Sequence, residues 1–188
     1  MGNKRFITTY TGLHVDPLQP EISDFRIEDI AHALSYICRG NGHTKTFLSV
    51  GQHCIWCARE AAARGLSPRL ILLALLHDAG ECYLSDVPSP LKQDMARYRE
   101  AENHLMDILD TAFLSAPPDE EEKKTIKEID KAFLWFDMKN LLEPIEGGEP
   151  KVHIRPDYTW RPFIEVEKEY LEIYRRYSTE VERKPAFT

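Results

Sequence analysis

The sequence predicts an all-α protein, a single-domain bundle of helices that spans residues 1–188. Three observations predict this fold. Apolar residues recur at helical spacing along most of the chain. Residues 70–76 are apolar almost all round, as in a helix that is buried on every side. The sequence shows no internal repeat or strand-rich stretch, and its length suits one domain with one substantial core.

The first third of the chain predicts an extended segment followed by two helices. Residues 1–26 are rich in turn formers, which favour an extended or looped conformation. Apolar side chains at helical spacing predict a helix over residues 27–38. A second helix is expected over residues 49–64 because Gly65 follows as a C-terminal stop.

Ser67 and Pro68 begin the third helix, since they supply an N-cap and a proline at the first helical position. This helix is expected over residues 69–79. The further expected elements are helices over 92–114 and 119–142, a loop insertion over 143–160 with a short hairpin near 152–154, and a C-terminal amphipathic helix over 161–178. Residues 27–142 are expected to form the core of the bundle.

Composition excludes several classes of function. The formal net charge of −7 argues against general binding to nucleic-acid polymers. No apolar run approaches the roughly 20 residues that cross a bilayer, and no apolar segment of a secretion signal follows the basic N-terminus. Phe6 stands where a myristoylation motif requires Ser or Thr. The sequence therefore predicts a cytoplasmic protein without a membrane partner.

The four cysteines are expected to be free thiols, because nothing in the sequence indicates secretion. Cys54 and Cys57 form a CxxC pair within an expected helix, and no second such pair accompanies it. We interpret them as two helix positions, with redox or metal chemistry as the alternative.

The adjacent pair His77-Asp78 follows directly on the apolar helix. A carboxylate at the end of a buried helix needs a partner, which is either the neighbouring imidazole or a metal ion. Glu81 lies one helical turn further on, and Asp86 follows in a proline-rich loop. A divalent cation bound by histidine and carboxylates explains this gathering of acids better than a solvated surface does.

His53 and Asp130 are the candidates that could complete such a site. His53 lies in the first turn of the helix over 49–64, where a lone histidine is more often structural. Asp130 lies in a charged helical segment, and taken alone it is interpreted as a surface acid. Neither residue indicates a metal by itself.

The order of these residues resembles a known superfamily. The residues that match the H…HD…D pattern of the HD-domain phosphohydrolases are His53, His77-Asp78 and Asp130. Residues 77–92 resemble the HDxxE…D(L/V)P(T/S)PxK block of the bacterial 5′-deoxynucleotidase branch. Residues 39–53 also resemble that branch and its phage relatives, in which an arginine precedes the first metal-binding histidine. The resemblance covers about residues 27–142 and implies a bundle of the HD-domain type.

The resemblance also implies roles for individual residues. The implied ligands of one divalent metal ion (Mn, Fe, Co, Ni, Zn or Mg) are His53, His77, Asp78 and Asp130. Glu81 would position or activate water, Asp86 would assist proton transfer, and Arg39 would contact phosphate. A bound metal polarises a phosphoryl oxygen and lowers the pKa of water, and guanidinium grips phosphate through two hydrogen bonds.

His43 and Lys92 are further phosphate-binding candidates by charge and position. A loop histidine and a helix-start lysine are the alternative interpretations. The aromatic residues Trp56, Trp135 and Phe136 are interpreted as core side chains rather than groups that stack on a base.

The sequence and its resemblance thus predict a metal-dependent phosphoric ester hydrolase that removes phosphate from nucleotides, foremost (deoxy)nucleoside 5′-monophosphates. The alternatives are a deoxynucleoside triphosphate hydrolase and a non-catalytic metal- or nucleotide-binding module. Alarmone hydrolases are disfavoured because Cys82, rather than a second acid, follows Glu81. The expected partner is a small-molecule nucleotide, and a homodimer is compatible with the family.

Overall fold

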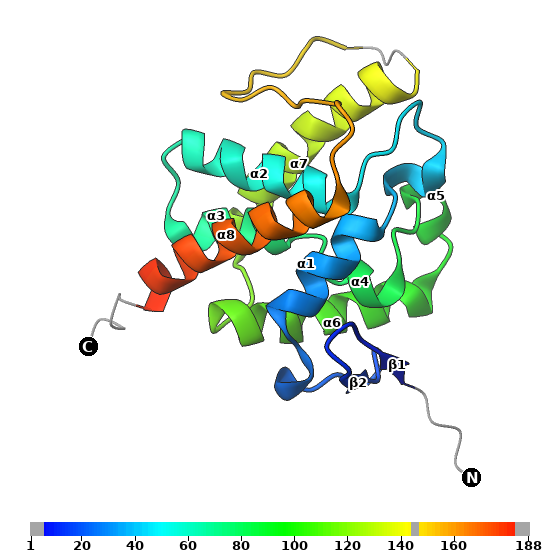
Figure 1. Cartoon of the computed structure of the whole chain (residues 1–188), viewed down its shortest axis with the longest axis vertical. Coiled ribbons are helices and arrows are strands. Elements are labelled where there is room, and N and C mark those ends of the chain that lie inside the picture. The colour runs from blue at the N-terminus through cyan, green and yellow to red at the C-terminus, as the bar shows by residue number, and fades with distance from the viewer. Residues whose placement is uncertain (1–5, 144–146, 183–188) are drawn as a thin grey trace.

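Helix α3 (Pro68–Leu76) packs against four other helices of the computed structural model, which describes residues 6–143 and 147–182 (Figure 1). Every side chain from Ile71 to Leu76 is buried. The helices that contact α3 are α2 (Val50–Ala63), α6 (Ala96–Leu114), α7 (Glu120–Leu141) and α8 (Phe163–Glu182). The described residues form one all-α domain, which confirms the predicted fold class.

Three helices begin where the sequence predicts, because short polar side chains cap their first N–H groups. Ser49 and Ser67 each accept a hydrogen bond from the backbone N–H three residues later, at 3.1 and 3.3 Å. Asp119 Oδ1 accepts two such bonds in the first turn of α7, at 2.9 and 2.8 Å. At the end of α2, Gly65 has a φ of 71°, which glycine adopts without strain.

Other boundaries differ from the predicted ones. Helix α1 (Ile27–Tyr36) ends two residues early, and α8 begins and ends later than predicted. The predicted helix over 92–114 corresponds to α6, which begins four residues later than predicted, because the short helix α5 (Ser89–Lys92) ends at Lys92 and residues 93–95 are not helical.

The N-terminal segment contains a β-hairpin that the sequence did not predict. The elements described there are β1 (Ile7–Thr8), β2 (His14–Val15) and the 3-10 helix η1 (Ile22–Asp24). The two strands pair antiparallel, but strands of two residues are too short to show the alternating pattern. Asp29 of α1 holds the hairpin, since its carboxylate accepts hydrogen bonds from the backbone N–H and hydroxyl of Thr11 at 2.6 and 2.8 Å.

The described residues 147–160 contain no strand, so the predicted hairpin near 152–154 is wrong. The backbone N–H groups of His153 and Ile154 instead donate to Glu60 Oε2 on α2, at 2.8 and 3.0 Å. Burial alone would raise the pKa of Glu60, but hydrogen bonds from Arg64 and His153 lower it below its ordinary value. A buried carboxylate thus takes the N–H groups that a hairpin would have paired.

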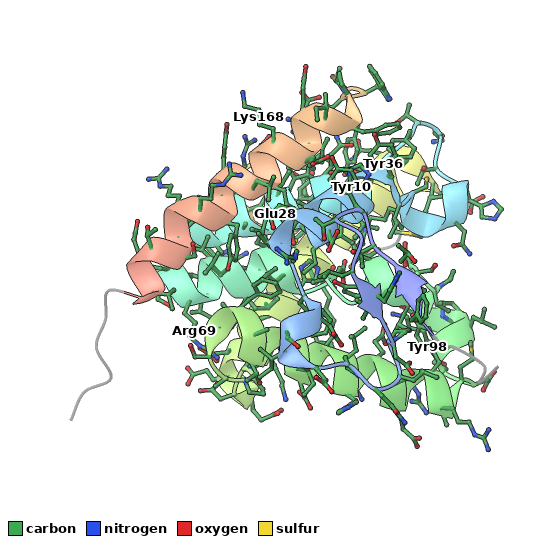
Figure 2. The ribbon with its side chains drawn as sticks, turned by 60° about the horizontal axis from the view of Figure 1, so that its bottom comes forward. Tyr10, Glu28, Tyr36, Arg69, Tyr98 and Lys168 are labelled. Carbon is green, nitrogen blue, oxygen red and sulfur yellow. The ribbon has the colours of Figure 1, made fainter. Side chains whose placement is uncertain are left out.

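Helix α6 is fixed near both ends by side chains labelled in Figure 2. The Tyr98 hydroxyl donates to the backbone carbonyl of Ser85, directly after the short helix α4 (Glu81–Leu84), at 3.0 Å. Arg69 donates to a carbonyl in the last turn of α6, at 2.7 Å. Between them, a Cβ on Gly80 would lie only 3.0 Å from Met106 Sδ. Glycine at this position lets the chain after α3 approach α6 closely, and this contact positions the segment that carries Glu81.

Candidate metal centre

Three helices bring the predicted metal ligands together. His53 lies in the first turn of α2, His77 and Asp78 follow the last turn of α3, and Asp130 lies in the middle of α7. Asp130 Oδ1 lies 3.0 Å from His53 Nε2 and 3.8 Å from His77 Nε2. Asp78 Oδ2 lies 3.2 Å from His77 Nε2. The four side chains therefore form one cluster.

Each imidazole is oriented by the ring nitrogen that faces away from Asp130. His77 Nδ1 lies 2.9 Å from Ala74 O, and because a carbonyl can only accept, Nδ1 must donate. His53 Nδ1 lies 3.4 Å from Asp137 Oδ2. His77 Nε2 is buried and has no hydrogen-bond partner among the described residues. His77, held through Nδ1 while Nε2 makes no hydrogen bond to a described residue, therefore has the arrangement that is typical of a metal-binding imidazole.

Asp137 is the residue of this cluster that the sequence did not single out. Its carboxylate is almost fully buried (4% exposed) and lies 3.1 Å from Arg39 Nε through Oδ2. Tyr158 donates its hydroxyl to Oδ1 at 2.9 Å. Asp137 follows Asp130 by seven residues, which places both on one face of α7. That spacing is the signal that could have identified it.

Arg39 occupies the 3-10 helix η2 (Arg39–Gly42) and contacts three carboxylates. Besides Asp137, its guanidinium lies 3.3 Å from Asp78 and 3.6 Å from Asp130. The structure therefore places Arg39 directly beside two predicted metal ligands, where it offsets part of their charge. Its contact with phosphate stays a prediction.

The carboxylates and imidazoles of the cluster stabilise one another's charged forms. Burial alone would raise the pKa of Asp78 and Asp130, but the neighbouring imidazoles hold both values well below their usual range. Burial alone would lower the pKa of His53 and of His77, and the charge of Arg39 would lower that of His53 further. The surrounding acidic groups outweigh these effects and raise both pKa values. The carboxylates are thus ionised while the imidazoles retain protons, which a metal ion would displace.

The side chains present fit a divalent cation. Two imidazoles and two carboxylates are ligands that the divalent transition metals accept, and His77 Nε2 makes no hydrogen bond to any residue that the structure describes. Two thiols lie at the same place. Two groups of three side chains have ligand atoms that all lie within 4.8 Å of one another. The first group is His53, Cys57 and His77, and the second is Cys54, His77 and Asp78.

Glu81 begins the short helix α4 (Glu81–Leu84) and is buried beside the cluster. Burial and the charges of Asp78 and Asp86 raise its pKa to about 9. Its Oε2 atom has no hydrogen-bond partner among the described residues. Asp86 Oδ2 accepts a hydrogen bond from Gly40 N at 3.0 Å, so it ties the loop that carries Arg39 to the segment after α4.

A cavity of about 510 Å³ opens beside the cluster. His77, Asp78, Glu81 and Asp130 line it on one side. Its other walls come mainly from α5, α6 and α7 and include three lysines: Lys92 of α5, and Lys123 and Lys127 of α7. The predicted phosphate ligand Lys92 pairs with Glu102 at 2.5 Å. His43 is exposed and is not among the lining residues, so the structure does not bring it to the cavity.

Comparisons with known proteins place the chain beside two bacterial relatives. It is 39% identical over 101 residues to "Uncharacterized protein YfdR" of Escherichia coli (strain K12), a match that spans about half the length (53%) of each chain. It is 32% identical over 154 residues to "Uncharacterized protein RCAP_rcc00048" of Rhodobacter capsulatus, with 78% of each chain covered. The chain belongs to the RCAP_rcc00048 family. No family model matches it.

For this member of the RCAP_rcc00048 family, two of the three aromatic side chains that were predicted to lie in the core are buried there. Trp56 and Phe136 are buried core residues, as predicted, whereas Trp135 is half-buried. All four cysteines are free thiols. Over residues 6–143 and 147–182, no helix is both long enough and apolar enough to cross a membrane.

Asp110 lines the same cavity, and its carboxyl group should make the free energy of unfolding depend on pH. Burial and the nearby charge of Asp107 raise its pKa to about 7, above the unfolded value of about 3.9. Stability is therefore lost as pH rises from about 4 to 7. We expect Asp110→Asn to stabilise the fold by about 1–2 kcal/mol at pH 8, with no gain at pH 4. Urea unfolding at both pH values measures this difference, and an equal gain at both would contradict it.

Proposed function

We propose that this chain is a metal-dependent phosphohydrolase of the HD-domain type that removes phosphate from nucleotides, with (deoxy)nucleoside 5′-monophosphates as its main substrates. One observation supports this most: two histidines and two aspartates from three helices form one cluster, and three of them (His77, Asp78 and Asp130) line a cavity. The volume of about 510 Å³ lies in the range of small-molecule sites.

His53, His77, Asp78 and Asp130 would hold the cation. When bound, a divalent metal supplies Lewis-acid polarisation of a phosphoryl oxygen and lowers the pKa of water. The chain itself supplies the remaining chemistry. Glu81 lines the cavity and would hold and move a proton at Oε2, which has no hydrogen-bond partner in the described part of the chain. Arg39 orients Asp78 and Asp130 and is near enough to share a phosphate oxygen with them.

Deoxynucleoside triphosphate hydrolysis is the second candidate, and the lysines of the cavity favour it. Lys127 and Lys123 precede Asp130 by one and two turns of α7 and line the same cavity. Both are therefore positioned to bind phosphates beyond the one that is cleaved. A non-catalytic binding module is disfavoured, because metal binding alone does not require the buried carboxyl group of Glu81.

A screen of metals against nucleotides tests the proposal. Purified protein loaded with Mn²⁺, Co²⁺, Ni²⁺, Zn²⁺, Fe²⁺ or Mg²⁺ would be incubated with mono- and triphosphates of each nucleoside. Release of orthophosphate from monophosphates supports the proposal, and release of triphosphate or pyrophosphate supports the second candidate. No turnover of any nucleotide with any metal would leave the binding module as the better description.

Asp78→Asn is expected to deplete the bound metal from about one ion per chain to near none. The amide keeps the size of the side chain but removes the charge that a cation requires. Elemental analysis of purified protein measures this, with the exposed Asp94→Asn as the matched control. Equal metal content in both variants would contradict the ligand assignment.

A further inference from the structure

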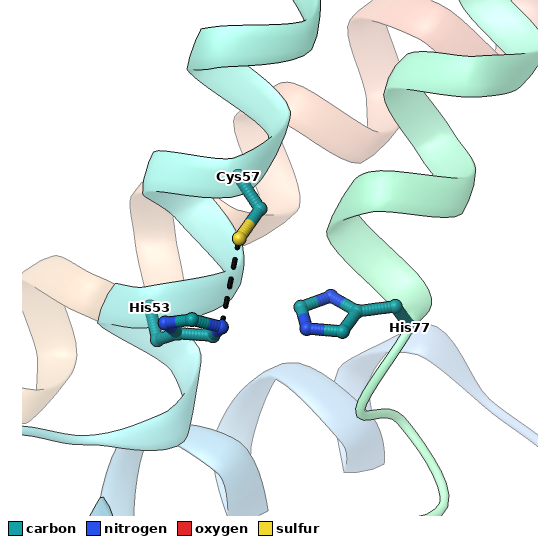
Figure 3. A group of neighbouring side chains, drawn as sticks. All are labelled: His53, Cys57 and His77. Carbon is teal, nitrogen blue, oxygen red and sulfur yellow. Dashed lines mark hydrogen bonds between the residues drawn. The ribbon is translucent and has the colours of Figure 1, made fainter. Parts of the chain in front are cut away.

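A thiol lies within the candidate metal centre. Cys57 follows His53 by one turn of α2, and both side chains are fully buried. Cys57 Sγ lies 3.5 Å from His53 Nε2, the same nitrogen that lies 3.0 Å from Asp130. Figure 3 shows the thiol and the imidazoles of His53 and His77 around one space between α2 and α3. The three ligand atoms lie within 4.8 Å of one another.

The separation of Cys57 Sγ and His53 Nε2 suits two ligands of one tetrahedral metal ion. Zinc binds imidazole nitrogen at about 2.0–2.1 Å and thiolate sulfur at about 2.3 Å, so two such ligands at a tetrahedral angle lie about 3.5 Å apart. The observed distance from Cys57 Sγ to His53 Nε2 is 3.5 Å. A cation could therefore replace the thiol hydrogen between these atoms without moving the backbone of α2.

We propose that the centre has a second ligand set, in which Cys57 joins His53 and His77 to bind a thiophilic divalent ion such as Zn²⁺, Cd²⁺ or Co²⁺. The inference rests on the proposed metal centre and deepens it. Soft thiolate selects these ions, whereas Mn²⁺ and Mg²⁺ prefer the carboxylates of Asp78 and Asp130. Binding converts the thiol to a thiolate and releases its proton to solvent.

The two sets share both histidines, so one ion excludes the other. A hard ion would leave the thiol of Cys57 protonated and unbound, and a thiophilic ion would draw His53 and His77 toward sulfur. The identity of the metal therefore decides whether Asp78 and Asp130 or Cys57 complete the coordination. Cys54 lies near His77 and Asp78 and is the other thiol that must be tested.

Cobalt spectroscopy tests the inference without reliance on activity. Co²⁺ would be titrated into the metal-free full-length protein, and a thiolate ligand would appear as a charge-transfer band in the near ultraviolet. The variants are Cys57→Ser and Cys57→Ala, with Cys54→Ser and Cys38→Ser as matched controls. Circular dichroism confirms that each variant is folded. We expect the band in the wild type and in both controls, and its loss in both Cys57 variants with the visible cobalt bands retained.

Affinity provides the second readout. Competition titration should show that Cys57→Ser weakens Cd²⁺ binding by tenfold or more, about the scale of a lost metal contact, and leaves Mn²⁺ affinity unchanged. Visible cobalt bands without a charge-transfer band in the wild type would overturn the inference but keep the metal centre. A band that is lost only in Cys54→Ser would overturn the assignment to Cys57. No cobalt binding at all would overturn the metal centre as well.

Discussion

Replacing Glu81 by glutamine is expected to lower kcat by about 10²- to 10⁴-fold while the bound metal stays in place. The range is that of a lost general acid–base group. The amide keeps the shape of the side chain but cannot exchange a proton. Because Asp78 and Asp86 repel the carboxylate form of Glu81, the neutral amide should cost the fold no stability. A loss of turnover would therefore report on chemistry rather than on folding.

Steady-state kinetics on the nucleotide that the screen identifies, together with elemental analysis, measure this effect. Glu102→Gln is the matched control, since Glu102 also lines the cavity but pairs with Lys92. The control should change KM more than kcat. If Glu81→Gln retains full kcat, or loses its metal, the role of Glu81 in proton transfer is refuted.

The sequence predicts those parts of the fold whose causes are local. Ser49, Ser67 and Asp119 mark helix starts because their side chains cap nearby N–H groups. The hairpin of β1 and β2 depends on a distant carboxylate, Asp29, and its two-residue strands carry no periodic pattern. Glu60 likewise binds backbone groups 93 and 94 residues away, which no local pattern reveals.

The candidate site follows the same division. Its four ligands could be predicted because the resemblance supplied their order, and the structure brings them together. Their local sequence alone favoured a structural histidine at position 53 and a surface acid at position 130. Lys123 and Lys127 were missed because only the packing of α7 shows which of its faces meets the cavity, whereas the spacing of Asp137 from Asp130 was a signal that the sequence did contain. Cys57 was correctly interpreted as a helix position. What that interpretation did not include is its contact with His53, which lies one helical turn earlier on α2.

Asp137→Asn is expected to weaken metal binding about 10- to 100-fold and to destabilise the fold by about 3–5 kcal/mol. The first figure is typical when the carboxylate behind a metal-binding histidine is lost. The second is typical when one partner of a buried ion pair is removed. Asp137 Oδ2 faces both Arg39 Nε and His53 Nδ1, at 3.1 and 3.4 Å. An amide in its place leaves the guanidinium buried with one carboxylate fewer.

Calorimetric metal titration and chemical unfolding separate these two effects. Tyr158→Phe is the matched control, because it removes a single hydrogen bond to Asp137, worth about 1 kcal/mol, and leaves the charges in place. The double variant Arg39→Gln with Asp137→Asn should be less destabilised than the sum of its single variants, since both remove the same ion pair. Additive losses would show that Asp137 acts independently of Arg39. Unchanged metal affinity in Asp137→Asn would show that it does not orient His53.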